Sequence, residues 1–304
     1  MVPKVSLSPN GPDFSRIVFG TWRVLDDPVT RDVEGLHERL RVCEEVGITT
    51  VDTAEIYGLY RVEEALGAAL ARDPSLRQRL QLVSKSGIYV PCAFHPERKT
   101  AFYNATAARI VKSAEKSLRF LGTDYLDLLL VHRPDWLASV DETAEGLNKL
   151  LKEGKIRSAG VSNYSVSQFD ALNSRMIQPL VTNQVEFSVL HMAPMDDGVF
   201  DHAQQHRYRP MAWSPLAGAR LWDQAHEPSK RLQALCARLS EKYGGATLDQ
   251  LAYAWVLAHP VGALPVIGTH KIERIQAAAS ASQLRLERED WYALWTAAKG
   301  HPIP

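Results

Sequence analysis

Short apolar runs rich in β-branched residues alternate with helical patterns along this chain, at intervals of about 25 to 50 residues. Runs of this length and composition predict β-strands. The eight predicted strands are residues 16–19, 49–51, 80–84, 126–131, 156–161, 181–186, 210–213 and 264–266.

The segments between these runs carry apolar residues at helical spacing. Two of the patterns, residues 33–43 and 107–121, end close to Gly47 and Gly122, and glycine is common where a helix ends. We expect the helical region 229–258 to be broken into two pieces at Gly244-Gly245. Capping boxes predict three helix starts: Ser139 with Glu142, Ser165 with Gln168, and Thr247 with Gln250.

Eight strands, each followed by a helix, is the number that closes a (β/α)8 barrel, with parallel pairing and right-handed crossovers. Because no serine-rich or charged linker divides the chain, we predict an α/β fold, a (β/α)8 TIM barrel formed by one domain of residues 1–304. An open doubly wound sheet is the alternative. It favours a Gly-x-Gly-x-x-Gly fingerprint after an early strand, whereas only Gly20-Thr21-Trp22 follows the first run here.

The composition mainly argues against certain partners and locations of the protein. With 35 basic and 35 acidic side chains the formal net charge is zero, which gives no support for nucleic acid or an anionic membrane as a partner. The three cysteines are far apart in the sequence and form no Cys-x-x-Cys pair, as is typical of reduced thiols in a cytoplasmic protein. No run approaches the roughly 20 apolar residues of a membrane span. We expect a cytoplasmic protein that is neither secreted nor inserted in a membrane.

Polar residues stand directly after several of the predicted strands. Asp52 follows the second strand, with Tyr57 five residues later, while Lys85 follows the third and His132 the fourth. Each residue by itself is common in purely structural roles. In a parallel barrel, however, the carboxyl ends of the strands meet at one face, so these four side chains together predict a shared active site.

The chemistry of the four residues is coherent. A charged Lys85 beside the Tyr57 hydroxyl would lower the pKa of that phenol, and Asp52 would hold the lysine charged and oriented. Tyr57 could then donate a proton to an oxygen, while His132 orients a carbonyl oxygen or assists the proton transfer. The sequence has no nucleophile elbow and no clear metal triad, so the group that attacks carbon is expected to come from a cofactor.

With these motifs in place, the chain resembles the aldo-keto reductases from Gly20 to Arg274. The segments that carry the resemblance are Gly20-Thr21-Trp22, V-D-T-A-E-I-Y-G at 51–58, V-S-K at 83–85, D-L-L-L-V-H-R-P-D at 127–135, G-K-I-R-S-A-G-V-S-N-Y at 154–164, N-Q-V-E-F-S at 183–188, W-S-P-L-A-G at 213–218 and P-V-I-G-T-H-K-I-E-R-I at 265–275. The resemblance implies a catalytic tetrad of Asp52, Tyr57, Lys85 and His132. It also implies NADPH-dependent reduction of aldehydes or ketones to alcohols by hydride transfer, with Tyr57 as the proton donor.

The resemblance also assigns cofactor contacts. Trp213 matches the position that stacks on the nicotinamide ring. The small-residue loop after it suits a pyrophosphate, and we expect Gly268-Thr269 to open the last helix with its N–H groups exposed. Cations in the first turn of that helix need an anion such as a 2′-phosphate, which favours NADP(H) over NAD. The predicted cofactor residues are Gly20, Thr21, Trp22, Asp52, Ser162, Asn163, Gln184, Trp213, Ser214, Pro215, Leu216, Ala217, Gly218, Ile267, Gly268, Thr269, Lys271 and Arg274.

The chain departs from the commonest family pattern at three positions near the cofactor. Ala277 and Ala278 stand where many relatives carry an acidic residue and an amide, and Gly268 stands where some carry a lysine.

The substrate is expected to be a small carbonyl compound, with its identity set by residues 88–102, 217–228 and the tail 285–304. The candidate pocket walls, which favour an apolar or aromatic substrate, are Trp22, Tyr57, Tyr89, His132, Trp136 and Trp222. A different class of function stays open: a non-catalytic regulatory subunit that senses a nicotinamide nucleotide with the same barrel. Nothing in the sequence indicates an oligomeric state.

Overall fold

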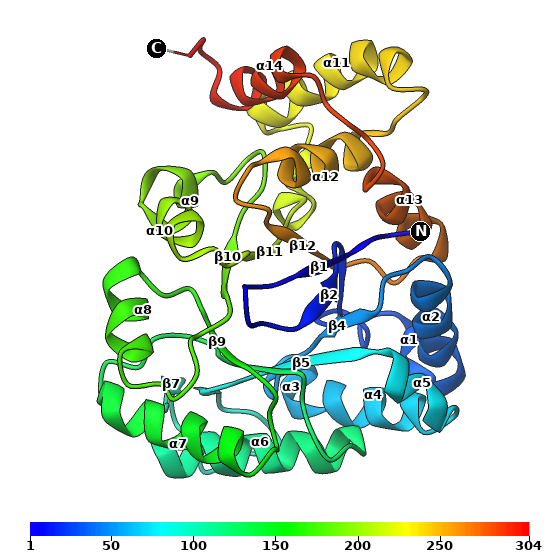
Figure 1. Ribbon diagram of the computed structural model, residues 1–304. Helices are drawn as coiled ribbons and strands as arrows, with labels where there is room; N and C mark the ends of the chain where they lie inside the picture. Colours follow the sequence, from blue (N-terminus) through cyan, green and yellow to red (C-terminus); the bar gives the residue numbers. More distant parts are fainter. Residues whose placement is uncertain (304) are drawn as a thin grey trace.

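Eight parallel strands close into a barrel in the computed structural model, which describes residues 1–303 (Figure 1). Their order around the barrel is β10-β11-β12-β3-β4-β5-β8-β9, so neighbouring strands follow one another along the chain. The TIM-barrel prediction is confirmed, and the open-sheet alternative is wrong. The barrel strands are β3 (Val18–Gly20), β4 (Thr50–Asp52), β5 (Gln81–Ser86), β8 (Leu128–Val131), β9 (Ala159–Ser162), β10 (Asn183–Glu186), β11 (Met211–Trp213) and β12 (Leu264–Ile267).

The observed strand limits are shifted toward the carboxyl ends of several predicted runs. Strand β9 begins at Ala159, since Ile156 pairs with Leu126 only through an isolated bridge. Conversely, β4 includes Asp52 and β9 includes Ser162. Hydropathy located the apolar part of each strand, but strand limits are set by backbone pairing, which continues into the polar residues at the barrel mouth.

Side chains alternate between the inside of the barrel and the layer of helices around it. On β8, Leu128 and Leu130 belong to the inner core, whereas Leu129 and Val131 pack in the outer core against the helices. This alternation follows from the two-residue repeat of a strand. The barrel interior is therefore filled by side chains.

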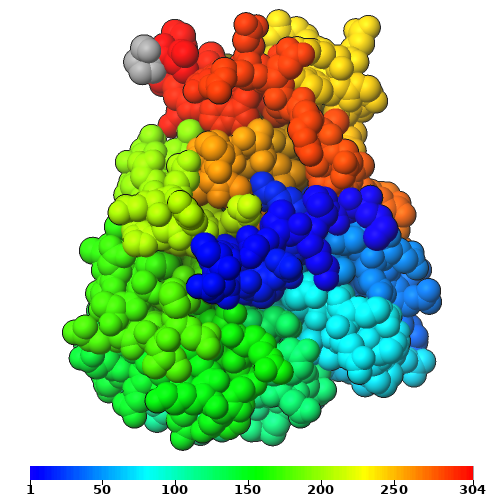
Figure 2. Space-filling model, in the orientation of Figure 1, coloured from blue at the N-terminus to red at the C-terminus, as the bar shows by residue number. Residues whose placement is uncertain are grey.

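A hairpin that the sequence analysis missed closes the amino-terminal end of the barrel. Strand β1 (Lys4–Ser6) pairs antiparallel with β2 (Asp13–Ser15). Leu7 and Phe14 are fully buried in the inner core. The hairpin lies across the centre of the barrel in Figure 1, and the N-terminal segment covers that part of the surface in Figure 2. The hairpin side chains thereby fill the barrel interior at this end.

The predicted helix ends and capping boxes are confirmed. Helix α2 (Val33–Glu45) ends before Gly47, and α6 (Ala107–Leu121) is followed by Gly122 with a φ of 64°. Capping boxes start α7 (Val140–Lys152), α8 (Val166–Asn173) and α12 (Leu248–Ala258). Gly244 and Gly245, with φ of 65° and 85°, separate α12 from α11 (Glu227–Lys242), as expected.

The remaining helices complete the ring or decorate it. They are α1 (Pro28–Arg31), α3 (Tyr57–Tyr60), α4 (Val62–Leu70), α5 (Pro74–Arg79), α9 (Ala193–Asp196), α10 (Val199–His206), α13 (Ile272–Ala281) and α14 (Arg288–Lys299), with a 3-10 helix at Ala217–Trp222. Within residues 1–303, no helix is both long enough and apolar enough to cross a bilayer.

Two of the predicted substrate loops are ordered by secondary structure. Residues 88–102 contain strand β6 (Ile88–Tyr89), which pairs with β7 (Phe102–Tyr103). In the tail, α14 lies beside α11 outside the ring of helices (Figure 1), and the Arg231 guanidinium donates to the Ala297 carbonyl at 2.7 Å. Trp291 stacks on Trp255 with ring centroids 4.6 Å apart.

Candidate active site

A cavity of about 510 Å³ opens at the carboxyl ends of the barrel strands. Most residues predicted from the sequence for the cofactor and the catalytic centre line this one cavity, although they come from seven different strand ends. The predicted residues that line it are Gly20, Trp22, Asp52, Tyr57, His132, Ser162, Asn163, Gln184, Trp213, Ser214, Pro215, Leu216, Gly218, Trp222, Ile267, Gly268, Thr269, Lys271 and Arg274.

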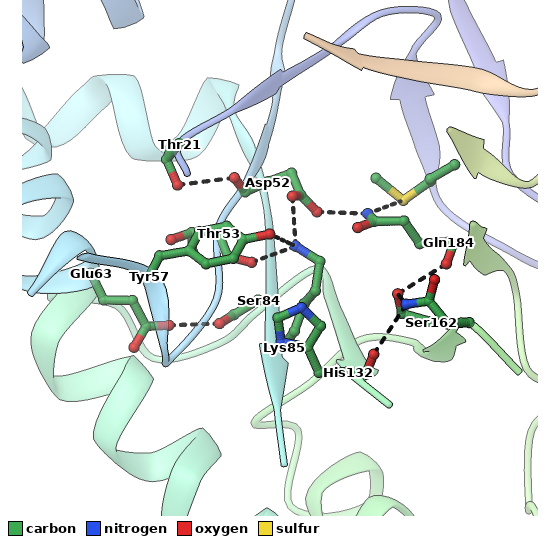
Figure 3. A network of polar contacts seen from close by, with 12 residues as sticks. Thr21, Asp52, Thr53, Tyr57, Glu63, Ser84, Lys85, His132, Ser162 and Gln184 are labelled. Atoms are coloured by element: carbon green, nitrogen blue, oxygen red, sulfur yellow. Dashed lines mark hydrogen bonds and ion pairs between the residues drawn. The ribbon is translucent and has the colours of Figure 1, made fainter. Parts of the chain in front are cut away.

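The Lys85 ammonium group is the centre of the polar network at the cavity floor (Figure 3). It donates to Asp52 Oδ2 at 2.6 Å, to the Tyr57 hydroxyl at 2.9 Å and to the Thr53 carbonyl at 2.9 Å. These three acceptors satisfy all three N–H donors of an ammonium. The side chain of Lys85 is fully buried behind Asp52 and Tyr57, so the lysine acts on the cavity only through its neighbours.

The second carboxylate oxygen of Asp52 is also occupied. Gln184 Nε2 donates to Asp52 Oδ1 at 2.8 Å, and the Thr21 hydroxyl donates to the Asp52 backbone carbonyl at 3.0 Å. Strands β4, β5 and β10 thus contribute to one carboxylate environment, while Thr21 holds the backbone of Asp52. A buried charge held by this many partners has a fixed orientation.

Burial and the neighbouring charges have opposite effects on the pKa values of Tyr57 and Lys85. Burial raises the pKa of Tyr57 above its ordinary value, and Lys85 lowers it only in part. The lowering by Lys85 is present as predicted, but desolvation, which the prediction did not include, outweighs it. Burial alone would lower the pKa of Lys85, but Asp52 and Tyr57 raise it above its ordinary value. At neutral pH this leaves a protonated phenol beside a charged ammonium, the state that a proton donor requires.

His132 lies near Tyr57 in an edge-on arrangement, with the two ring centroids 5.9 Å apart. Burial, and then the positive charges of Lys85 and Arg133, hold the pKa of His132 well below its usual range. The imidazole is therefore neutral. Its Nδ1 atom has no hydrogen-bond partner within residues 1–303. A neutral imidazole beside the phenol is a suitable hydrogen-bond donor to a carbonyl oxygen.

A chain of hydrogen bonds positions the polar groups above β9, β10 and β11. The Trp213 indole N–H donates to Asn163 Oδ1 at 3.0 Å, and the Asn163 amide donates to the Ser162 hydroxyl at 2.8 Å. The Ser162 hydroxyl donates in turn to the Gln184 carbonyl at 2.9 Å. Asn163 has a φ of 60°, an uncommon value for a residue other than glycine. Such strain is typical of functional positions.

Two loops form the opposite wall of the cavity. In the loop after β11, Ser214, Ala217, Gly218 and Ala219 have positive φ values between 50° and 74°. Turns of this kind direct successive backbone N–H groups into a concavity that suits an anion. After β12, helix α13 begins at Ile272 with Lys271 at its N-cap position, which corrects the prediction that Gly268 and Thr269 open this helix.

Comparisons with known proteins agree with this geometry. The family model described as the aldo/keto reductase family matches residues 16–298. This chain belongs to the aldo/keto reductase family. Oxidoreductase YdhF of Escherichia coli strain K12 is 43% identical over 307 residues, which cover 100% of each chain. A 6-dehydroglucose reductase of Agrobacterium fabrum is 40% identical over 291 residues, 96% of each chain. The crystal structure of an aldo-keto reductase from Klebsiella pneumoniae in complex with NADPH has a TM-score of 0.77 and 33% identity, covering 100% of this chain and 97% of that one.

Some predicted residues lie outside the cavity of this aldo/keto reductase. Lys85, Thr21 and Ala217 are buried behind its walls. Tyr89 is fully buried, with its hydroxyl 2.8 Å from the Ser113 hydroxyl, so it does not form a substrate wall. Trp136 does not either, since it is 84% exposed at the surface. Their positions within loops gave no indication of side-chain direction.

Other residues of the cavity were missed by the sequence analysis. They are Arg23, Arg133, Ala219, Asp249, Tyr253, Val266 and His270. Arg23 and Arg133 could have been found, because each directly follows a predicted site residue at a strand end. Asp249 and Tyr253 belong to α12, whose sequence gives no indication that it reaches the barrel mouth.

A second buried carboxyl group, Glu63, supports the strand that carries Lys85. The Ser84 hydroxyl donates to one of its oxygens at 2.6 Å (Figure 3), and the Ser117 hydroxyl donates to the other at 3.0 Å. Burial raises the pKa of Glu63 to about 7. Through these bonds Glu63 joins α4 to β5 and α6 behind the cavity, and so helps to fix the position of Lys85.

Proposed function

We propose that this protein reduces aldehydes or ketones to alcohols with NADPH, using Tyr57 as the proton donor. The observation that carries the proposal is the Lys85 ammonium group, which joins the Asp52 carboxylate and the Tyr57 hydroxyl directly beneath the cavity. Membership of the aldo/keto reductase family supports oxidoreductase chemistry.

Each residue of the network has a distinct part in the proposed reaction. Bound NADPH supplies the hydride that reduces the carbonyl carbon. Tyr57 donates its phenolic proton to the carbonyl oxygen as negative charge develops there. Lys85 stabilises the resulting phenolate, and Asp52 keeps the lysine charged. Neutral His132 orients the carbonyl oxygen by a hydrogen bond.

The cavity fits a nicotinamide dinucleotide. The left-handed turns at Ser214–Gly218 suit a pyrophosphate, and Trp213 offers an aromatic face near Tyr57 and His132 for the nicotinamide ring. Lys271 and Arg274 at the other end of the cavity would hold a 2′-phosphate. Solved relatives from Klebsiella pneumoniae contain NADP and NADPH, which supports NADP(H) as the cofactor.

The cofactor preference gives one prediction. Arg274→Ala is expected to raise the Kd of NADPH about 10- to 100-fold and to leave the Kd of NADH nearly unchanged, because only NADPH carries the 2′-phosphate. Both constants are measured by quenching of tryptophan fluorescence. The exposed Arg238 on α11 provides the control, since Arg238→Ala removes an equal charge far from the cavity lining. An unchanged ratio of the two constants in Arg274→Ala would refute the assignment.

The substrate class follows from which side chains reach the cavity. Two of the predicted aromatic walls, Tyr89 and Trp136, lie elsewhere, whereas Arg23 and Arg133 lie at the cavity. This shifts the proposal from an apolar carbonyl compound to a polar one. Two relatives named 6-dehydroglucose reductase, 40% and 35% identical to this chain, support a hydroxylated aldehyde as the substrate.

The cytoplasmic location of the protein stays a prediction.

The test of the proposed function is direct. Purified protein is mixed with NADPH and either 4-nitrobenzaldehyde or D-glyceraldehyde, and NADPH consumption is followed by absorbance. We expect turnover of both, with one alcohol formed for each NADPH oxidised. Protein that binds NADPH and reduces neither these two nor a broad panel of carbonyl compounds would refute the proposal and favour the regulatory subunit instead.

A further inference from the structure

Arg133 is a cation at the reacting end of the cavity that the proposed chemistry does not use. It directly follows His132 at the end of β8 and lines the cavity together with His132 and Tyr57. Its positive charge is among the causes that lower the pKa of His132 and oppose the rise in that of Tyr57. The guanidinium group is therefore close enough to act on the groups that contact a carbonyl substrate.

Arg133 has no counterion within residues 1–303. The nearest acid in sequence, Asp135, instead accepts hydrogen bonds from the backbone N–H groups of Ala105 and Leu137. Asp52, which also lines the cavity, is held by Lys85 and Gln184. A half-buried guanidinium without an anionic partner gains free energy when a ligand supplies one.

The 2′-phosphate of the cofactor is poorly placed to be that partner. In the barrel order, β8 lies three strands from β11 and four strands from β12 in either direction. The loops proposed for the pyrophosphate and the 2′-phosphate follow β11 and β12. Arg133 is thus across the barrel from the 2′-phosphate site, on the side of the catalytic residues.

The contact between Arg133 and Trp213 indicates how the guanidinium is presented. Its central carbon lies 5.9 Å from the centre of the Trp213 ring. A guanidinium that rests against an aromatic ring keeps its N–H edges free, and those edges match the two oxygens of a carboxylate. A single cation also matches a monoanion better than a phosphate, which carries close to two charges at neutral pH.

We propose that the natural substrate is an aldehyde or ketone that carries a carboxylate, and that Arg133 binds this carboxylate. The proposal rests on the reductase function proposed above and deepens it, since it names the charge of the substrate. Arg133 then acts as the residue that determines specificity, while Tyr57, Lys85 and His132 act on the carbonyl group.

The test compares substrates that differ only in charge. The ratio of kcat/KM for 3-formylbenzoate over its methyl ester, and for 4-formylbenzoate over its methyl ester, is measured with NADPH in the wild type and in variants. We expect at least one acid to exceed its ester by about tenfold in the wild type. Arg133→Met is expected to lower that ratio about 10- to 100-fold through KM, because a charge-assisted hydrogen bond is lost. Arg133→Lys should keep part of the preference.

The matched control is Arg238→Met, which removes a cation from the exposed face of α11, outside the cavity lining, and should leave the acid-to-ester ratio within about threefold of the wild type. The inference is overturned if both esters are reduced as well as their acids, or if Arg133→Met and Arg133→Lys keep the wild-type ratio. Reduction of the esters without discrimination would overturn only this inference. No reduction of the acids, the esters, 4-nitrobenzaldehyde, D-glyceraldehyde or the broad carbonyl panel would overturn the proposed function with it.

Discussion

Tyr57→Phe is expected to lower kcat for 4-nitrobenzaldehyde about 1,000-fold, because the phenolic proton has no substitute in the cavity. The hydroxyl is the part of Tyr57 that Lys85 contacts, at 2.9 Å, while the ring packs edge-on against Trp22 with centroids 4.8 Å apart. Phenylalanine keeps the ring and its packing. The Kd of NADPH is therefore expected to stay within about threefold of the wild type, which separates loss of chemistry from loss of binding.

A neighbouring tyrosine provides the control for this substitution. Tyr60 is buried in the same short helix α3, but its hydroxyl accepts hydrogen bonds from Val90 N at 2.9 Å and Arg98 Nη1 at 2.7 Å, away from the cavity. Tyr60→Phe also removes one phenolic hydroxyl and should leave kcat within about threefold of the wild type. A kcat for Tyr57→Phe within tenfold of the wild type would show that another group donates the proton.

Lys85→Met is expected to abolish measurable turnover and also to lower the free energy of unfolding by about 3 kcal/mol. The substitution keeps most of the side-chain volume but removes the cation from a fully buried ion pair. Asp52 Oδ2 and the Tyr57 hydroxyl then lose their donor at the floor of the cavity. Unfolding in urea, followed by circular dichroism at pH 7, gives the stability, and NADPH consumption gives the activity.

A double variant separates the two effects. In Lys85→Met with Asp52→Asn, no carboxylate is left without its cation, so most of the lost stability should return while turnover stays absent. If Lys85→Met alone unfolds with a free energy within about 1 kcal/mol of the wild type, the ion pair does not have the energetic role that its burial indicates.

The barrel itself could be predicted from the sequence because its signals are local. The apolar runs, the glycines at helix ends and the three capping boxes each depend on residues a few positions apart, and all agree with eight strand–helix units. The amino-terminal hairpin was not predicted because Leu7, just after β1, and Phe14 in β2 are single apolar residues between polar neighbours. Their burial depends on the barrel that they close.

In the candidate site, too, some features could be predicted from the sequence and others could not. The strand-end rule located Asp52, Tyr57, Lys85 and His132, and the structure brings them together as the spacing indicated. Sequence could not give the net effect of burial on the pKa of Tyr57, since desolvation depends on all the surrounding chain. Nor could it show that Gln184 contacts Asp52, a pair separated by 132 positions.

The sequence by itself determined the fold class, the order of its elements, the four central residues and the resemblance that names the family. These depend on residue type, local spacing and the single geometric rule that parallel strands end at one face. Only the tertiary structure decided which loop side chains face the cavity. It placed Tyr89 and Trp136 elsewhere and left Arg133 beside His132 with no acidic partner among residues 1–303, because side-chain direction and charge pairing are set by packing between distant segments.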